Sequence, residues 1–133
     1  MAQASYPEEL LYHPQHDWAR IDDSGPEPLA TLGITWYAQE QLGEVVFFEA
    51  PALGTVLAKD SPYTEVESVK AVSDVVAPLS GEIVEVNPIA TENPGMINED
   101  PYGEGWLVKV RLSGPAERDA LLDAAAYRAS LDG

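Results

Sequence analysis

Short runs of β-branched and aromatic residues fill most of the chain and predict a mainly β protein. The first run, Leu10–Ile21, suits a strand with an irregular entry and should pair through a turn at 22–26 with Leu29–Ile34 as an N-terminal hairpin. Further strands are predicted at 45–49, 55–58, 63–69, 72–77, 82–86 and 106–112. In the last of these, alternation puts Trp106, Val108, Val110 and Leu112 on one face and Leu107 on the other. Such spacing is typical of a small sandwich or barrel.

Three segments carry helix signals instead. Thr35 should cap a short helix over 36–42 that ends at Gly43. Pro115 should begin a helix after Gly114, and Asp123 should cap another that ends near Leu131. The stretch 93–105 is predicted as a turn-rich acidic loop. We therefore expect one domain over 1–133, with a core at 10–112 and a C-terminal helical segment at 114–131 packed on it.

Composition narrows the function classes. The 133 residues include no cysteine, which excludes disulfides, thiolate metal sites and a cysteine nucleophile, so any sulfur chemistry needs an added group. The net charge of -16 disfavours nucleic-acid and membrane partners. It leaves open whether the acidity serves solubility or docking to basic partners. No run approaches the roughly 20 apolar residues of a membrane span, and Met1–Glu9 does not resemble a targeting segment. We expect a cytoplasmic protein, or a mitochondrial matrix protein if this is a processed organellar form.

Lys70 is the candidate for chemistry. It lies where two β-prone arms meet at Val69-Lys70, and a type I turn tolerates both residues. A tight hairpin would hold the amine outward, with the small neighbours Ser68 and Ala71 leaving access for an acylating enzyme. A surface lysine among carboxylates has the same appearance, so the turn alone does not decide its role.

The role of Lys70 is indicated instead by several segments that resemble one protein family. ESVKAVSD (67–74) and APLSGEIVEVN (77–87) are similar to the lipoyl-attachment segment of glycine cleavage H proteins. HDW (16–18), the segment 33–49, NEDPYGEGWLVKV (98–110) and LLDAAAYRASL (121–131) also resemble that family in order and spacing. The resemblance covers nearly the whole chain.

The resemblance implies a hybrid barrel–sandwich fold and lipoate joined by an amide to Lys70, which would change the charge from -16 to -17. Lipoate would supply the missing sulfur. The attachment-loop residues Glu67, Ser68, Val69 and Ala71 would be recognised by a lipoate ligase or octanoyltransferase. The carrier, itself not an enzyme and expected as a monomer, would shuttle an aminomethyl group from glycine decarboxylase (P protein) to aminomethyltransferase (T protein). Dihydrolipoamide dehydrogenase (L protein) would reoxidise it.

The same resemblance implies a cleft that shelters the labile, cationic aminomethyl arm. The matching positions are Asp17 and Asp74, with Gln15 and Gln41 as further candidates. Asp17 is shorter than the glutamate often found there, and Gln15 stands where serine is common.

Other classes fit less well. A 2-oxo-acid dehydrogenase lipoyl domain usually has Asp-Lys-Ala at the turn, and a biotinyl carrier flanks its lysine with methionines, whereas Val69 and Ala71 flank Lys70. A stand-alone enzyme would need an acid–base set that the sequence does not offer. The segment from His13 to Asp17 has metal-ligand residue types but no third histidine or cysteine, so no metal is expected. A lipoyl donor for other complexes remains an alternative.

Overall fold

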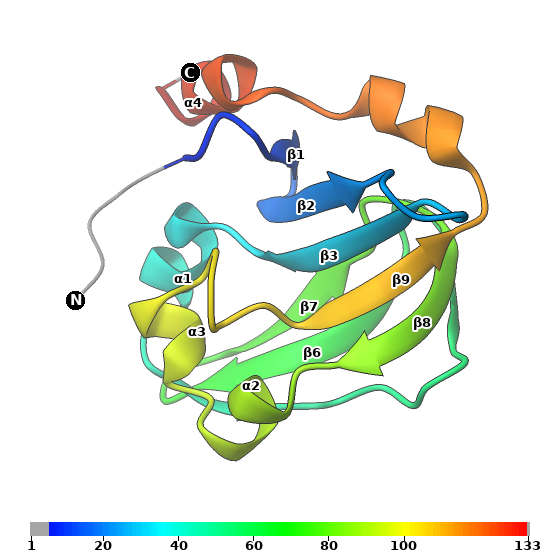
Figure 1. The fold of residues 1–133 in the computed structure, drawn as a ribbon. Helices are drawn as coiled ribbons and strands as arrows, with labels where there is room; N and C mark the ends of the chain where they lie inside the picture. Colours follow the sequence, from blue (N-terminus) through cyan, green and yellow to red (C-terminus); the bar gives the residue numbers. More distant parts are fainter. Residues whose placement is uncertain (1–5, 133) are drawn as a thin grey trace.

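Two antiparallel sheets form most of the molecule (Figure 1). The structure is a computed structural model that describes residues 6–132, so residues 1–5 and 133 lie outside it. The larger sheet has the strand order β1-β2-β3-β9-β8-β5, and the smaller has the order β4-β6-β7. The strands are β1 (Leu11–His13), β2 (Asp17–Asp22), β3 (Leu29–Ile34), β4 (Val45–Phe48), β5 (Val56–Leu57), β6 (Pro62–Ser68), β7 (Val72–Val76), β8 (Gly81–Val86) and β9 (Val108–Leu112).

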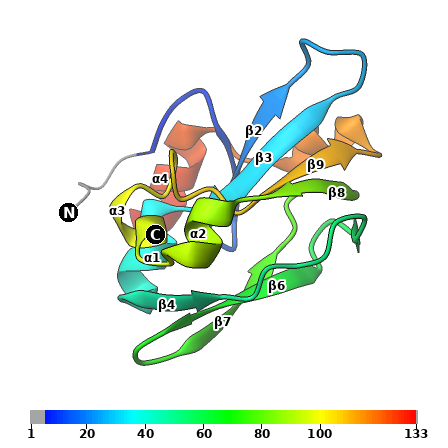
Figure 2. The same ribbon diagram turned by 60° about the horizontal axis from the view of Figure 1, so that its bottom comes forward.

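The smaller sheet lies against the larger one without closing into a barrel, as Figure 2 shows. Leu32, Val66 and Ile83 come from both sheets and are almost completely buried in one apolar cluster. The predicted mainly β class is confirmed, and the strands at 29–34 and 82–86 lie within a residue of their predicted bounds.

A second cluster joins the N-terminal strands to the C-terminal helix. It contains Trp18, Tyr12 and Tyr127, all fully buried. Trp18 lies directly opposite Gly33, where a Cβ atom would come within 2.6 Å of the indole ring. Glycine at this position therefore makes room for the tryptophan.

Helices cap the ends of the sandwich. They are α1 (Trp36–Leu42), α2 (Pro88–Glu92), α3 (Met96–Glu99), a 3-10 helix at Pro115–Ala120, and α4 (Ala124–Asp132). The prediction for α1 is confirmed: Thr35 Oγ1 accepts from the Ala38 amide, and Gly43 follows the helix with a φ of 87°. Asp123 accepts from the Ala126 amide at the start of α4, also as predicted. No helix among residues 6–132 is both long and apolar enough to cross a bilayer.

Three local predictions were wrong. The segment 93–105 contains α3 rather than only a loop, because a short helix forms after Gly95. The run 10–21 is split into β1 and β2, because His16 adopts a φ of 76° and breaks the strand. Leu107 is fully buried beside Val108, because it precedes β9, where the alternation of faces begins.

Candidate functional site

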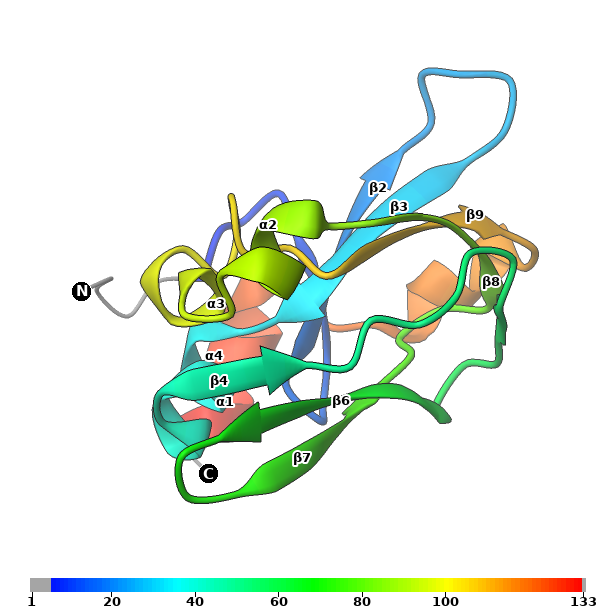
Figure 3. The same cartoon turned by 90° about the horizontal axis from the view of Figure 1, so that it is seen from below.

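The β6–β7 hairpin presents Lys70 at its tip, at one end of the molecule (Figure 3). The last paired residues are Glu67 and Val72, and the Ser68 amide then donates to the Ala71 carbonyl at 2.7 Å. Val69 and Lys70 are left as the two central residues of the turn, and both are exposed. The two-residue turn expected from the sequence is therefore present.

Ser68 makes this turn possible without glycine or asparagine. Neither Val69 nor Lys70 has a positive φ, which is compatible with a type I turn, a geometry that matches strand twist poorly. Ser68 Oγ compensates by accepting from the amides of Lys70 and Ala71 at 3.3 and 3.0 Å. The Val69 amide donates to the Glu44 carbonyl at 3.1 Å, which ties the tip to the segment after α1.

Replacing Ser68 by alanine should loosen the tip. The variant loses the two bonds that Oγ accepts and the one that it donates to the Ala71 carbonyl at 3.2 Å, and we expect a loss of about 1 kcal/mol in the free energy of unfolding. Urea unfolding measures this loss, and hydrogen exchange should show faster exchange at the Lys70 and Ala71 amides. Ser113→Ala, which changes an exposed serine just after β9 and outside the hairpin, is the matched control. Unchanged exchange at the tip would contradict the role given to Ser68.

The Lys70 side chain packs against Gly43 at the end of α1. A Cβ atom on Gly43 would lie 3.2 Å from Lys70 Cε, and its φ of 87° also favours glycine. The lysine side chain therefore lies close to the residue that follows Leu42. Leu42 in turn lines the cavity described next.

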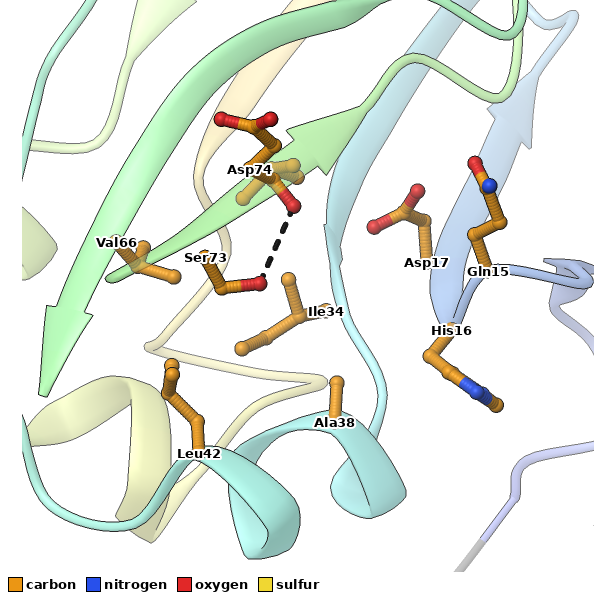
Figure 4. A pocket seen from close by; sticks show the side chains of 10 residues that line it. Gln15, His16, Asp17, Ile34, Ala38, Leu42, Val66, Ser73 and Asp74 are labelled. Carbon is orange, nitrogen blue, oxygen red and sulfur yellow. Dashed lines mark hydrogen bonds between the residues drawn. The ribbon is translucent and has the colours of Figure 1, made fainter. Parts of the chain in front are cut away.

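A small cavity of about 30 Å³ lies between α1, β2, β3 and the β6–β7 hairpin (Figure 4). Its apolar wall is formed by Ile34, Ala38, Leu42, Val66 and Val75. Gln15, His16, Asp17, Ser73 and Asp74 supply the polar part of the lining. The volume suits one amine-sized group rather than a large ligand.

Asp17 is the unusual member of this lining. Its side chain is 2% exposed, and Oδ2 has no hydrogen-bond partner among the described residues. Burial raises the pKa of the Asp17 carboxyl well above its usual range, while a hydrogen bond from the Val76 backbone lowers it only in part. The Tyr63 hydroxyl is a second buried group with no hydrogen-bond partner within residues 6–132, and burial and the Asp17 charge raise the pKa of that phenol. One oxygen of the Asp17 carboxyl, Oδ2, is therefore left to accept a hydrogen bond from a donor or cation that enters the cavity.

The C-terminal helix holds the frame around Asp17. The Tyr127 hydroxyl lies 2.8 Å from both His16 Nδ1 and Thr35 Oγ1, so one α4 side chain joins the start of β2 to the cap of α1. Burial lowers the pKa of His16, and nearby His13 lowers it further, which favours the neutral imidazole. The position of Asp17 thus depends on a segment more than a hundred residues away in sequence.

The structure brings three of the four predicted cleft residues together. Asp17, Asp74 and Gln15 line the cavity, and in Figure 4 the Asp17 carboxylate points from β2 toward β7. The Asp74 carboxylate lies on the far side of its main chain from Ile34, while its carbonyl accepts from Ser73 Oγ at 3.3 Å. Gln41 is exposed and does not line the cavity; Ala38 and Leu42 are the α1 residues that do.

Sequence reasoning missed Ser73, Tyr63 and the apolar wall. Ala38 and Leu42 are four residues apart on α1, a spacing that places two side chains on one helix face and gave a usable signal. Ser73 lies opposite Val66 in the hairpin register, on the face turned toward the cavity. Tyr63 gave no local signal, because the burial of its hydroxyl depends on residues that are distant in the sequence.

The two histidines serve different contacts. His13 Nε2 lies 2.7 Å from Asp60 Oδ1, whereas His16 contacts Tyr127. Within residues 6–132 no group of three potential ligand side chains is arranged to hold a metal ion.

Comparison with known proteins shows the family to which the chain belongs. A sequence model described as "Glycine cleavage H-protein" matches residues 10–133. This chain belongs to the glycine cleavage H-protein family. A relative named "Glycine cleavage system H protein" from Symbiobacterium thermophilum is 50% identical over 126 residues, which are 95% of each chain. A mitochondrial H protein from Oryza sativa subsp. indica is 50% identical over 118 residues, covering 89% of this chain and 70% of the relative.

The H-protein fold is shared as well. The crystal structure of an H protein from Mycobacterium marinum has a TM-score of 0.85 and 38% identity, covering 96% of this chain and 99% of that one. The expected hybrid barrel–sandwich is thereby confirmed. Membership of the H-protein family supports a carrier role in the glycine cleavage system, consistent with a component that is not itself catalytic.

Proposed function

We propose that this chain carries lipoate on Lys70 and shuttles an aminomethyl group from the P protein to the T protein, with reoxidation by the L protein. The observation that carries the proposal is an exposed lysine at the tip of a rigid two-residue turn in an H-protein fold. When bound, lipoate supplies the redox-active sulfur that a chain without cysteine lacks.

The residues around Lys70 fit an attached arm. The amine is exposed, Ser68 fixes the turn, and Gly43 leaves space for the side chain beside α1. Glu67, Ser68, Val69 and Ala71 form the loop that an attaching ligase or octanoyltransferase would recognise. Acylation of Nζ removes the one cation of the hairpin, so the site becomes more acidic for a cationic cargo.

Shelter of the cargo is the second part of the proposal. The partnerless Asp17 oxygen accepts a hydrogen bond from the cargo ammonium, and the apolar wall keeps water from the labile carbon. Asp74 lines the cavity through its main chain and adds negative charge from the outer side of β7, and Gln15 lines the opposite side. Gln41, exposed on α1, takes no part in this arrangement.

Asp74→Asn should shorten the lifetime of the loaded arm modestly, by about two- to threefold, because an exposed charge is screened by solvent. The free energy of unfolding should change by less than about 0.5 kcal/mol. Release of formaldehyde and ammonia from the loaded protein measures the lifetime, with Asp119→Asn, an exposed change on the C-terminal segment, as control. An unchanged release rate would exclude Asp74 from the shelter.

Intact mass of the protein from its native host, followed by reconstitution with the P, T and L proteins, tests the whole assignment. We expect the mass of one lipoyl group on Lys70 and glycine-dependent exchange of carbon dioxide. Full lipoylation without exchange would overturn the shuttle and favour a lipoyl donor for other complexes. We place the chain and these enzymes in the bacterial cytoplasm, or in the mitochondrial matrix if the chain is a processed organellar form.

A further inference from the structure

Exposed apolar side chains lie on both sides of Glu67 on the outer face of the small sheet, beside the Lys70 hairpin, and we call them the apolar row. In the strand register Phe47 lies opposite Glu67, and Glu67 lies opposite Val72, so the three side chains share one face. Phe47 is 45% exposed and Val72 is 58% exposed. Val46, at the register shift in β4, is 50% exposed next to them. Large apolar side chains exposed together in this way mark interaction sites more often than isolated ones do.

A row of carboxylates follows directly on the same face. Glu65 lies opposite Asp74, and the Glu49 amide donates to the Glu65 carbonyl at 3.0 Å, so the three acids are neighbours across three strands. All three are exposed. Like charges opposite one another destabilise a sheet.

Nothing in the described part of the chain offsets this repulsion. None of Glu49, Glu65 and Asp74 forms an ion pair with any residue of 6–132. Lys70, the cation nearest to them along the hairpin, loses its charge when it is acylated. A surface that pairs three carboxylates beside an apolar row is complementary to an apolar patch rimmed by arginine or lysine.

We propose that this outer face, made of Val46, Phe47, Val72, Glu49, Glu65 and Asp74, is the docking surface for the enzyme that acylates Lys70. The inference rests on the proposed function, because it assumes that Lys70 is the acceptor. Acyl transfer requires the enzyme to bring its reacting carbon to Nζ, so the enzyme surface must contact the strands that flank the hairpin tip. Enzymes that act on the far end of a long arm are under no such constraint.

Acyl transfer to Lys70 needs no oxidant or reductant. The Lys70 ammonium first loses a proton, and Nζ attacks the carbonyl carbon of an activated acyl donor, a thioester or acyl phosphate anhydride. The amide bond forms, the leaving group departs with its electron pair, and Nζ loses a second proton. The docking surface provides position only.

Phe47→Thr tests the apolar row, with threonine chosen because it keeps β propensity. We expect KM for the carrier in acylation to rise about tenfold, with kcat within about twofold, as for an interface anchor. Val56→Thr, which introduces the same residue at a 78% exposed apolar position on β5, should leave KM within about twofold of the original value.

The double variant Glu49→Gln, Glu65→Gln tests the carboxylate row. At low salt its KM should rise about fivefold, and the difference should vanish near 0.5 M salt, where charges are screened beyond ~4 Å. Its Tm should rise by about 2 °C, because the like-charge row is relieved. The control Glu92→Gln, Glu104→Gln removes the same charge elsewhere on the surface.

These experiments distinguish failure of the docking surface from failure of the proposed carrier function. Unchanged acylation KM in both test variants overturns the docking surface, as does a rise of equal size in the controls. An unchanged acylation KM with a raised KM in glycine-dependent exchange also overturns it, since the face would then belong to the decarboxylase. Complete end-point acylation of Lys70 by mass leaves the proposed carrier function standing in each case, whereas unmodified Lys70 in the wild type would remove that function itself.

Discussion

Replacing Lys70 by arginine should abolish lipoylation and glycine-dependent carbon dioxide exchange while leaving the fold intact. A guanidinium stays protonated at every physiological pH and offers no amine lone pair for attack on an acyl carbon. Arginine keeps the positive charge, so the electrostatics of the hairpin are preserved. The loss should therefore be complete rather than partial.

Stability should not follow activity in this variant. The turn is held by Ser68 and by main-chain bonds, and the exposed Lys70 side chain forms none of them. We expect the free energy of unfolding to stay within about 0.5 kcal/mol of the original value. Urea unfolding and circular dichroism measure this directly.

Intact mass after incubation with the acylating enzyme and lipoate gives the chemical readout. Lys59→Arg is the matched control, because it makes the same substitution at a lysine paired with Asp60 outside the hairpin. That control should be lipoylated fully and support exchange. A lipoyl group found on the Lys70→Arg protein would move the acceptor to another lysine and sink the assignment of the site.

The parts that sequence predicted well are those whose causes are local. The helix at 36–42 begins at the Thr35 hydroxyl and ends at Gly43, and both signals lie within two turns of chain. The hairpin tip at Val69-Lys70 is likewise fixed by Ser68, two residues away. Local hydrogen bonds of this kind join residues a few positions apart, so their residue types and spacing can be recognised in the sequence alone.

One local signal was present and misread. Asn87 accepts from the Ile89 amide and Pro88 occupies the first turn of α2, an arrangement that usually begins a helix. No helix was expected between the strand at 82–86 and the loop at 93–105. Five residues of helix gave too short a periodic pattern to correct that interpretation.

The state of Asp17, in contrast, has no local cause. Position 17 could be assigned to a cleft only through family resemblance, and nothing near it in sequence predicts complete burial. The burial comes from the hairpin, α1 and the Tyr127 contact of α4 closing over the start of β2. A partnerless carboxylate oxygen is a property of that whole assembly.

Asp17→Asn should make the protein without cargo more stable at neutral pH and the loaded protein shorter-lived. The wild type buries a carboxyl with one oxygen unpartnered, which costs about 1–3 kcal/mol when the group ionises or is left unsatisfied. Because burial raises the pKa of Asp17 in the folded state, the unfolded chain ionises first, and the stability of the wild type falls as pH rises above about 4.

The asparagine variant does not titrate at this position, so its advantage should be largest near pH 7 and should narrow toward pH 4. Urea unfolding across pH 4–8 measures the gap, and Asp119→Asn, an exposed change, should show none of it. An asparagine variant that is less stable at every pH would mean that the carboxylate is satisfied in solution and has a structural role.

Asp17→Asn should have the opposite effect on the loaded protein, whose lifetime it should shorten. A cationic amine docked against Asp17 would gain a charge-assisted hydrogen bond of about 1.5–3 kcal/mol, so asparagine should shorten the loaded lifetime by roughly 10- to 100-fold. Formaldehyde and ammonia release from the loaded variant measures the lifetime, and the effect should exceed that of Asp74→Asn because Asp17 is buried and Asp74 is exposed. A variant that gains stability yet releases its cargo at the original rate would show that the cavity is not the shelter. Stability gained together with retention lost would mean that Asp17 is kept, at a cost to folding, for the cation it receives.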